Sequence, residues 1–252
     1  MGTLQFIFCT QLIAVVLASG WVAISAEPVP PAATIAAAVG AGIGMTVGLA
    51  AFFQAMVVGT MSVVAPISAT GVVVPIAAGV VGGERPIPTQ VLGMIVAIVG
   101  IVLASRSPRE HPSVRRESGL GLALLAALGA GLMFWLLAPA SRHGVPWALL
   151  IARVIPALIL AATVTIRRAS LRPALVPRNA RVILASALLG FAGVTLYAFA
   201  TLHGQLVIVS VLASLYPAVT VLLAYRLLGE RLHGVQQVGI AATLAGIILL
   251  ST

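Results

Sequence analysis

The sequence lacks several residue types on which enzymes depend. It contains no aspartate and no lysine, and it has five glutamates and one cysteine among 252 residues. Without lysine there is no Schiff base, without aspartate there is no Ser-His-Asp triad, and no G-x-x-x-x-G-K phosphate-binding loop occurs. The lone Cys9 and four scattered histidines provide no metal-ligand spacing. The sequence therefore predicts no enzyme, no direct use of ATP, no metal site and no cofactor.

Charged residues are also scarce. They make up 8% of the chain, whereas a soluble domain usually carries about 25%. Hydrophobic residues make up 61%, and the mean hydropathy is +1.17. Apolar runs of about 20 residues recur along the whole length, and each can cross a hydrocarbon core of about 30 Å as a helix. The composition predicts an all-α, multi-pass membrane protein built as a helical bundle.

The net charge of +9 is distributed as in a membrane protein and not as in a nucleic-acid-binding protein. All fourteen basic residues are arginines, and nearly all lie between apolar runs or at their ends. Such positions contact anionic lipid headgroups and set the orientation in the membrane. The expected partners are the lipid bilayer and a small molecule, with no nucleic acid, in a monomer or a homodimer. Eleven arginines fall in the loops at 106–118, 167–181 and 226–233, which this count places in the cytoplasm.

Turn residues divide the apolar sequence into nine predicted spans. The proline-rich EPVPP at 27–31 ends the first span, because proline cannot continue a helix. Gly82-Gly83 suits the C-terminus of the third span. The predicted spans are 4–24, 33–55, 60–82, 88–105, 119–140, 146–166, 181–201, 205–228 and 234–251.

A repeated phrase indicates how the chain is organised. GERPIPTQVLG at 83–93 returns as GERLHGVQQVG at 229–239, and nine of the 23 positions of 83–105 are identical 146 residues later. The phrase joins the last two helices of a duplicated unit. We expect a first repeat at 1–105, a basic connecting loop at 106–118 and a second repeat at 119–252.

The two repeats hold four and five spans. The span without a counterpart is 119–140, so the first helix of the first repeat is expected either to be missing or to be encoded upstream of Met1. Because five is an odd number, the two copies insert with opposite orientations. Inverted repeats of this kind are typical of secondary transporters, which bind substrate near the membrane midplane between the repeats.

Two segments resemble a known family. SVLASLYPAVTVLLAYRLLGERLHGVQQVGIAATLAGIILLS at 210–251 and SVVAPISATGVVVPIAAGVVGGERPIPTQVLGMIVAIVGIVLAS at 62–105 are similar to the C-terminal end of an EamA domain, of the drug/metabolite transporter superfamily. The resemblance implies an inverted repeat of two EamA-like units, with nine spans here and ten in the complete family fold. It implies a carrier of small metabolites or drugs in the cytoplasmic (plasma) membrane. It also implies a cytoplasmic C-terminus, which the arginine count places outside, so the orientation stays open.

The repeated Gly-Glu-Arg turn has two interpretations. It is either a gate at the membrane surface or a solvated turn whose charges mark the interface and cap helix ends, and the sequence favours the turn. The residues of this family motif are Gly83, Glu84, Arg85, Gly229, Glu230 and Arg231.

Arg153 is the sharpest single candidate. It falls about seven residues into the span 146–166, which is roughly 10 Å along a helix. A charge at mid-membrane costs about 2.5–3.5 kcal/mol on insertion scales and marks a functional site, unless the side chain extends to the interface. Its counterpart is Gln11, if the 167–180 loop is four residues longer than its equivalent. Two polar residues at equivalent positions suit a pocket between the repeats.

The spans 60–82 and 205–228, which are the fourth helices when each repeat is counted as five, carry prolines and hydroxyl groups. Proline frees backbone carbonyls that a water-lined pathway can satisfy, although small hydroxyl residues also serve close helix packing. The predicted pathway residues on these helices are Ser68, Thr70, Ser210, Ser214, Tyr216 and Pro217.

These observations favour a secondary carrier that works by alternating access. Arg153 would suit a substrate with a carboxylate or phosphate, so amino acids or organic acids are favoured, with export as the expected direction. No acidic residue lies within a predicted span, which disfavours the carboxylate-dependent exchange of protons for cationic drugs used by small multidrug-resistance relatives. The alternatives are a non-transporting or truncated membrane protein that acts as an assembly partner, and a drug efflux carrier.

Overall fold

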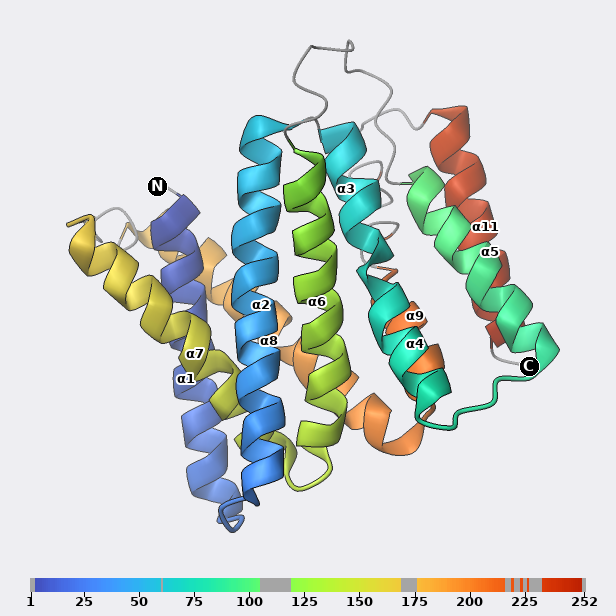
Figure 1. Ribbon diagram of the computed structural model, residues 1–252. Coiled ribbons are helices and arrows are strands. Elements are labelled where there is room, and N and C mark those ends of the chain that lie inside the picture. Colours follow the sequence, from blue (N-terminus) through green and yellow to red (C-terminus); the bar gives the residue numbers. More distant parts are fainter. Residues whose placement is uncertain are drawn as a thin grey trace. The chain divides into compact units, whose positions relative to one another are not determined.

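The structure is a computed structural model that describes residues 3–59, 61–104, 119–168, 176–215 and 233–250, with the isolated positions 219, 223 and 226. Within these ranges the chain is helical and contains no strand (Figure 1). Five helices are long and apolar enough to cross a membrane: α1 (Thr3–Ser25), α2 (Ala32–Val58), α6 (Leu120–Ser141), α7 (Val145–Ile166) and α8 (Pro177–His203). The predicted all-α, multi-pass membrane fold is confirmed.

The chain forms two compact units. Unit 1 consists of Met1–Thr46 and Leu136–His203, and unit 2 consists of Val47–Trp135 and Gly204–Thr252. Helices α2 and α6 contribute residues to both units, and each unit contains residues from both predicted repeats. The predicted division at 106–118 concerns the duplication in the sequence, and it stays a prediction.

Unit 1 is built on α1, which packs along α7 and also contacts α8. The Trp21 ring of α1 lies 6.4 Å from the ring of Phe191 and 6.0 Å from that of Phe199, both on α8. At one end of this unit, the Trp147 indole donates a hydrogen bond to the Glu27 carbonyl oxygen over 3.1 Å. The aromatic contacts join α8 to α1, and the hydrogen bond joins α7 to the segment that follows α1.

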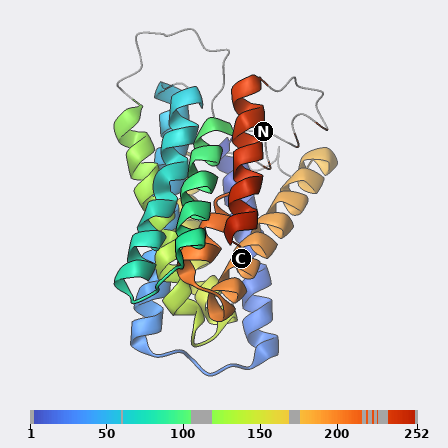
Figure 2. The same ribbon diagram turned by 90° about the vertical axis from the view of Figure 1, so that its right-hand side faces the viewer.

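Unit 2 is dominated by the pairing of α5 (Pro88–Ala104) with α11 (Gly234–Leu250) (Figure 2). A methyl group added to Gly93 would lie 2.9 Å from the carbonyl oxygen of Gly246, and one added to Gly100 would lie 2.7 Å from that of Gly239. These distances are shorter than any real carbon atom tolerates, so the two backbones touch because glycine occupies both sides. Gly93 and Gly100 correspond to Gly239 and Gly246 in the sequence repeat.

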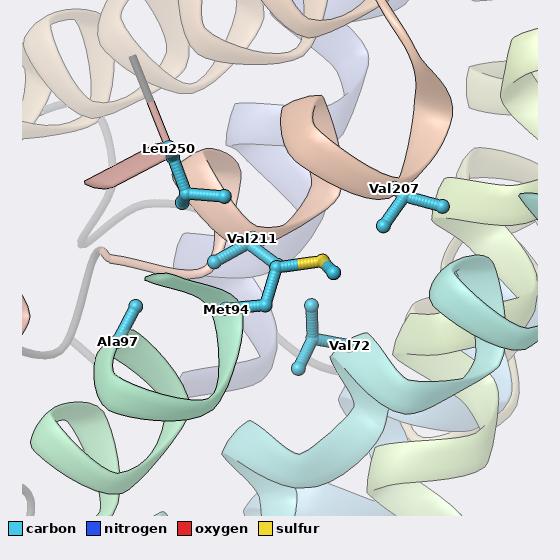
Figure 3. Packing of buried hydrophobic residues seen from close by; sticks show 6 residues of the cluster. All are labelled: Val72, Met94, Ala97, Val207, Val211 and Leu250. Atoms are coloured by element: carbon cyan, nitrogen blue, oxygen red, sulfur yellow. The ribbon is translucent and has the colours of Figure 1, made fainter. Parts of the chain in front are cut away.

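The rest of unit 2 packs around this pair. Helix α4 (Val73–Val81) contacts α9 (Leu206–Ala213), and α5 contacts α3 (Met61–Ala69) and α9. Figure 3 shows Met94 of α5 among apolar side chains of three other elements. The buried residues of this cluster are Val72, Met94, Ala97, Val207, Val211 and Leu250.

The predicted span 60–82 is one apolar run but not one continuous α-helix. It divides into α3, the 3-10 helix η1 (Thr70–Val72) and α4. The reason is Pro75, which has no N–H to donate to the carbonyl of Gly71 four residues earlier. The Thr70 hydroxyl bonds to the Ile67 carbonyl at the same place, over 2.6 Å. In the predicted span 205–228, α9 ends at Ala213 and a turn includes Ser214.

Large apolar side chains face outward from both units. Leu189 of α8 is 75% exposed and Ile248 of α11 is 66% exposed. An isolated soluble chain rarely exposes apolar residues in this number, whereas lipid solvates them without penalty. The buried positions are correspondingly occupied by small residues such as Ala18, Ala38 and Ala97, each fully buried.

Candidate functional site

Arg153 lies on the ninth position of α7, about 12 Å from the start of that helix. Its side chain is only 6% exposed, so it does not extend to an exposed helix end. The Nη1 group donates a 2.8 Å hydrogen bond to Oε1 of Gln11 on α1. The Nη2 group lies 3.5 Å from the Gly190 carbonyl oxygen of α8, which is the limit of a hydrogen bond. Three helices of unit 1 therefore meet at this guanidinium.

Gln11 is held in one orientation by this arrangement. It is 4% exposed, and its amide nitrogen lies 3.9 Å from the Met45 sulfur on α2 while its amide oxygen accepts from Arg153. Gly42 allows α2 to approach α7 beside this pair, since an added methyl would lie 2.8 Å from the Ala152 carbonyl oxygen. The two residues that the sequence paired as counterparts are in direct contact.

No carboxylate of the described residues forms an ion pair with Arg153. A guanidinium has five N–H donors in a planar fork, and two of them are directed at the partners just named. A buried cation without an anion is costly, and it is retained where it binds something. The remaining donors have the planar geometry that suits a carboxylate or a phosphate.

The predicted hydroxyl groups lie in unit 2. Ser68 on α3 is 7% exposed, and its hydroxyl has no hydrogen-bond partner among the described residues. The Thr70 hydroxyl bonds to the Ile67 carbonyl and the Ser214 hydroxyl to the Val211 carbonyl, each within its own helix. Ser210 on α9 is 1% exposed. Tyr216 and Pro217 lie outside the described residues.

The Gly-Glu-Arg turn of the first repeat closes α4 in a Schellman motif. The Gly83 N–H donates to the Val80 carbonyl over 3.1 Å and the Glu84 N–H to the Gly79 carbonyl over 3.0 Å. Gly83 has φ +96°, a conformation that other residues rarely adopt. The predicted helix end at Gly82-Gly83 is thus present, and it fixes the direction of the Glu84 side chain. Gly229, Glu230 and Arg231 lie outside the described residues.

Glu84 and Arg85 differ in their surroundings. Arg85 is exposed, as a solvated turn requires. Glu84 is half-buried, and its carboxylate accepts hydrogen bonds from the backbone N–H groups of Leu206 and Val207 at the start of α9, over 2.7 Å and 2.9 Å. The charge therefore does cap a helix end, but the helix lies more than 120 residues further along the chain. A charge that caps a helix end and a solvated Arg85 both belong to the turn interpretation, and the choice between gate and turn stays a prediction.

The glutamine of the repeated phrase has a defined role in both copies. Gln90 Oε1 accepts a hydrogen bond from the Ile87 N–H, and Gln236 Oε1 accepts one from the His233 N–H, each over 3.1 Å. In both cases the glutamine is the third residue of a helix and reaches back to the residue that precedes the helix, as in a capping box. The second helix of the motif begins where the sequence placed it.

A family model with the description "EamA-like transporter family" matches residues 117–252. The chain belongs to the EamA-like transporter family. It is a multi-pass membrane protein of transporter type, and the family match points away from an enzyme. No curated protein matches the chain. Among the solved structures that match, one described as "Crystal structure of protein" has a TM-score of 0.79 at 14% identity, over 100% of this chain and 88% of that chain, which shows the fold alone.

Proposed function

We propose that this EamA-family chain is a secondary transporter that exports small metabolites bearing a carboxylate, such as amino acids or organic acids, across the plasma membrane. The observation that carries the proposal is the buried Arg153, which has two neutral acceptors and no carboxylate partner among the described residues. An anionic substrate would supply the missing charge.

Alternating access gives this charge a use in transport. A carrier binds substrate in one conformation and releases it in another, which requires that the two conformations differ in their affinity for the substrate. Arg153 belongs to the second predicted repeat and Gln11 to the first, so motion between the repeats would lengthen or break their 2.8 Å hydrogen bond. Gln11 would hold the guanidinium while the site is empty, and the substrate would compete for the same donors.

The experiment is substrate transport by the purified protein in proteoliposomes, with radiolabelled amino acids and organic acids and with a cationic drug for comparison. Arg153→Gln is expected to lower carboxylate transport at least about tenfold, since a charge-assisted hydrogen bond contributes about 1.5–3 kcal/mol. Arg153→Lys keeps the charge but loses the planar fork, so we expect an intermediate rate. Arg142→Gln removes an exposed arginine of unit 1 and is the matched control.

Each outcome decides between the candidate functions. Carboxylate transport that depends on Arg153 and not on Arg142 supports the proposal. Carboxylate transport at the unmodified rate in Arg153→Gln would overturn the role of this residue. Movement of the cationic drug alone would indicate a drug efflux carrier, and absence of any transport by the folded chain would indicate an assembly partner. Efflux from preloaded cells tests the direction.

A further inference from the structure

Helix α9 lacks a cap of its own. Its N-cap residue is Gln205, whose side chain makes no capping hydrogen bond. The first N–H groups of any helix have no acceptor within the helix, and leaving them buried and unpaired costs free energy. Here the groups of Leu206 and Val207 are both satisfied by Glu84, one on each carboxylate oxygen. The negative charge also suits the positive end of the helix dipole.

The approach of the two elements depends on Gly79. A methyl group added there would lie 2.6 Å from Val207 Cγ2 and 2.7 Å from Glu84 Oε2. Gly79, in the last turn of α4, therefore lets the carboxylate and the first turn of α9 lie against it together. Val207 and Val211 of α9 are themselves fully buried in the apolar cluster of unit 2 (Figure 3). The end of α4 and the start of α9 are therefore in direct contact at Gly79.

We propose that Glu84 and Gly79 form a latch that keeps one end of the transport pathway closed, by holding the start of α9 against the end of α4 in the conformation described here. The two oxygens of this carboxylate connect the end of α4 to the start of α9. Helix α9 carries the predicted pathway residue Ser210, and α4 continues the predicted span that carries Ser68 and Thr70. Opening this end during transport would require α9 to leave the carboxylate, and the loss of two charge-assisted hydrogen bonds sets the cost of that step. This inference rests on the proposed transport function.

The test measures opening without any substrate, so it is independent of the transport assay. Cys9, the only cysteine, is replaced by alanine, and a reporter cysteine is placed at Val211, which is fully buried. A charged methanethiosulfonate reagent labels the thiol only when water reaches it. We expect Glu84→Ala to label about tenfold faster than the unmodified background. Glu84→Gln, which keeps one acceptor oxygen, should lie between them.

Gly79→Ala gives a second way to open the latch, because it displaces the carboxylate and Val207 while Glu84 is still present. It is expected to accelerate labelling at position 211 in the same way. Arg85→Ala, next to Glu84 but exposed, is the matched control and should leave the labelling rate unchanged. A second reporter at Ala41, fully buried in unit 1, detects general unfolding.

Labelling from the two membrane sides completes the test. A cysteine at the exposed Arg85 position identifies the side on which the turn lies, in intact cells and in inverted vesicles. Selective acceleration at position 211 from that side supports the latch. Unchanged labelling in Glu84→Ala, acceleration from the opposite side, or parallel acceleration at position 41 would each overturn it, and would make Glu84 a cap that stabilises the fold only.

Discussion

Helices α5 and α11 are counterparts in the sequence repeat, α1 and α7 are predicted counterparts, and the two pairs are joined by opposite means. In unit 2, α5 and α11 touch through glycines, with no side chain between the backbones at Gly93, Gly100, Gly239 and Gly246. In unit 1, α1 and α7 are joined at their buried polar position by the long side chains of Gln11 and Arg153. Both pairs bring helices of the two predicted repeats together, but one does so through the absence of side chains and the other through a charged side chain.

The difference separates structural packing from function. The glycine contacts allow one packing arrangement of α5 against α11, because displacement of either helix would produce a steric clash or a cavity. Burial of the Arg153–Gln11 pair lowers the free energy of unfolding, compared with apolar side chains of the same size. We infer that α5 and α11 move as one piece, while the α1–α7 contact is the one that responds to substrate.

The largest effect is expected from filling the glycine contact. In Gly100→Leu the first added carbon would lie 2.5 Å from both the backbone nitrogen and the hydroxyl of Thr243. Overpacking usually costs about 1–3 kcal/mol, and a backbone that cannot move raises this further. We expect loss of folded protein, measured as the yield of monodisperse protein in detergent and its Tm. Gly121→Leu, where no atom lies within 4 Å of the added carbon, is the control; an equal Tm in both would contradict the comparison.

The second prediction concerns the opposite pair. The double variant Gln11→Leu with Arg153→Met replaces the polar pair by apolar side chains of similar size. Replacement of a buried ionic group in this way is often neutral or stabilises by about 1–4 kcal/mol. We expect a higher free energy of unfolding in mixed micelles together with loss of carboxylate transport. A clear decrease in stability would show that the pair is there for the fold.

The single variant Gln11→Leu should act in the other direction. It leaves the guanidinium buried and removes its 2.8 Å acceptor, so we expect destabilisation by about 1.5–3 kcal/mol. The same unfolding measurement gives the value, and comparison with the double variant isolates the interaction between the two residues. If the single and double variants are equally stable, Arg153 has found another partner and the site differs from the one described.

The smallest effects are expected at the two capping glutamines. Gln90→Ala and Gln236→Ala each remove one hydrogen bond at the start of α5 or α11, at a cost of about 1 kcal/mol. Because the two hydrogen bonds have the same length and join the same helix positions, the two variants should lower the Tm by the same amount. Thr89→Ala, an exposed neighbour, is the control. Unequal effects would mean that the two capping glutamines have taken different roles.

The sequence predicted most of the helices, because their apolar residues occur on all sides and need no partner to be recognised. It also located the end of α4 at Gly82-Gly83 and the start of α5 near Gln90, since both depend on local turn chemistry. The interruption at Thr70–Val72 was not predicted, because hydropathy is unchanged across it. Here the proline at position 75 was the available signal.

The candidate site was predictable only in part. The sequence placed Arg153 and Gln11 at equivalent positions but not in contact, since two helices can pair at many registers. The contact of Glu84 with α9 left no trace in the pattern of residues, because its partners are backbone N–H groups that every residue except proline provides. Recurrence of the Gly-Glu dipeptide was the one sign that this turn does more than connect two helices.

The contact of Arg153 with Gln11, its predicted counterpart, has a consequence for how such a chain can diverge. Two identical copies placed face to face would set arginine against arginine at this point, and like charges in a buried position repel strongly. Joining the copies in a single gene lets one position become glutamine while the other keeps its charge. The difference between Gln11 and Arg153 replaces this repulsion by a donor and an acceptor, and it leaves one buried guanidinium at this contact.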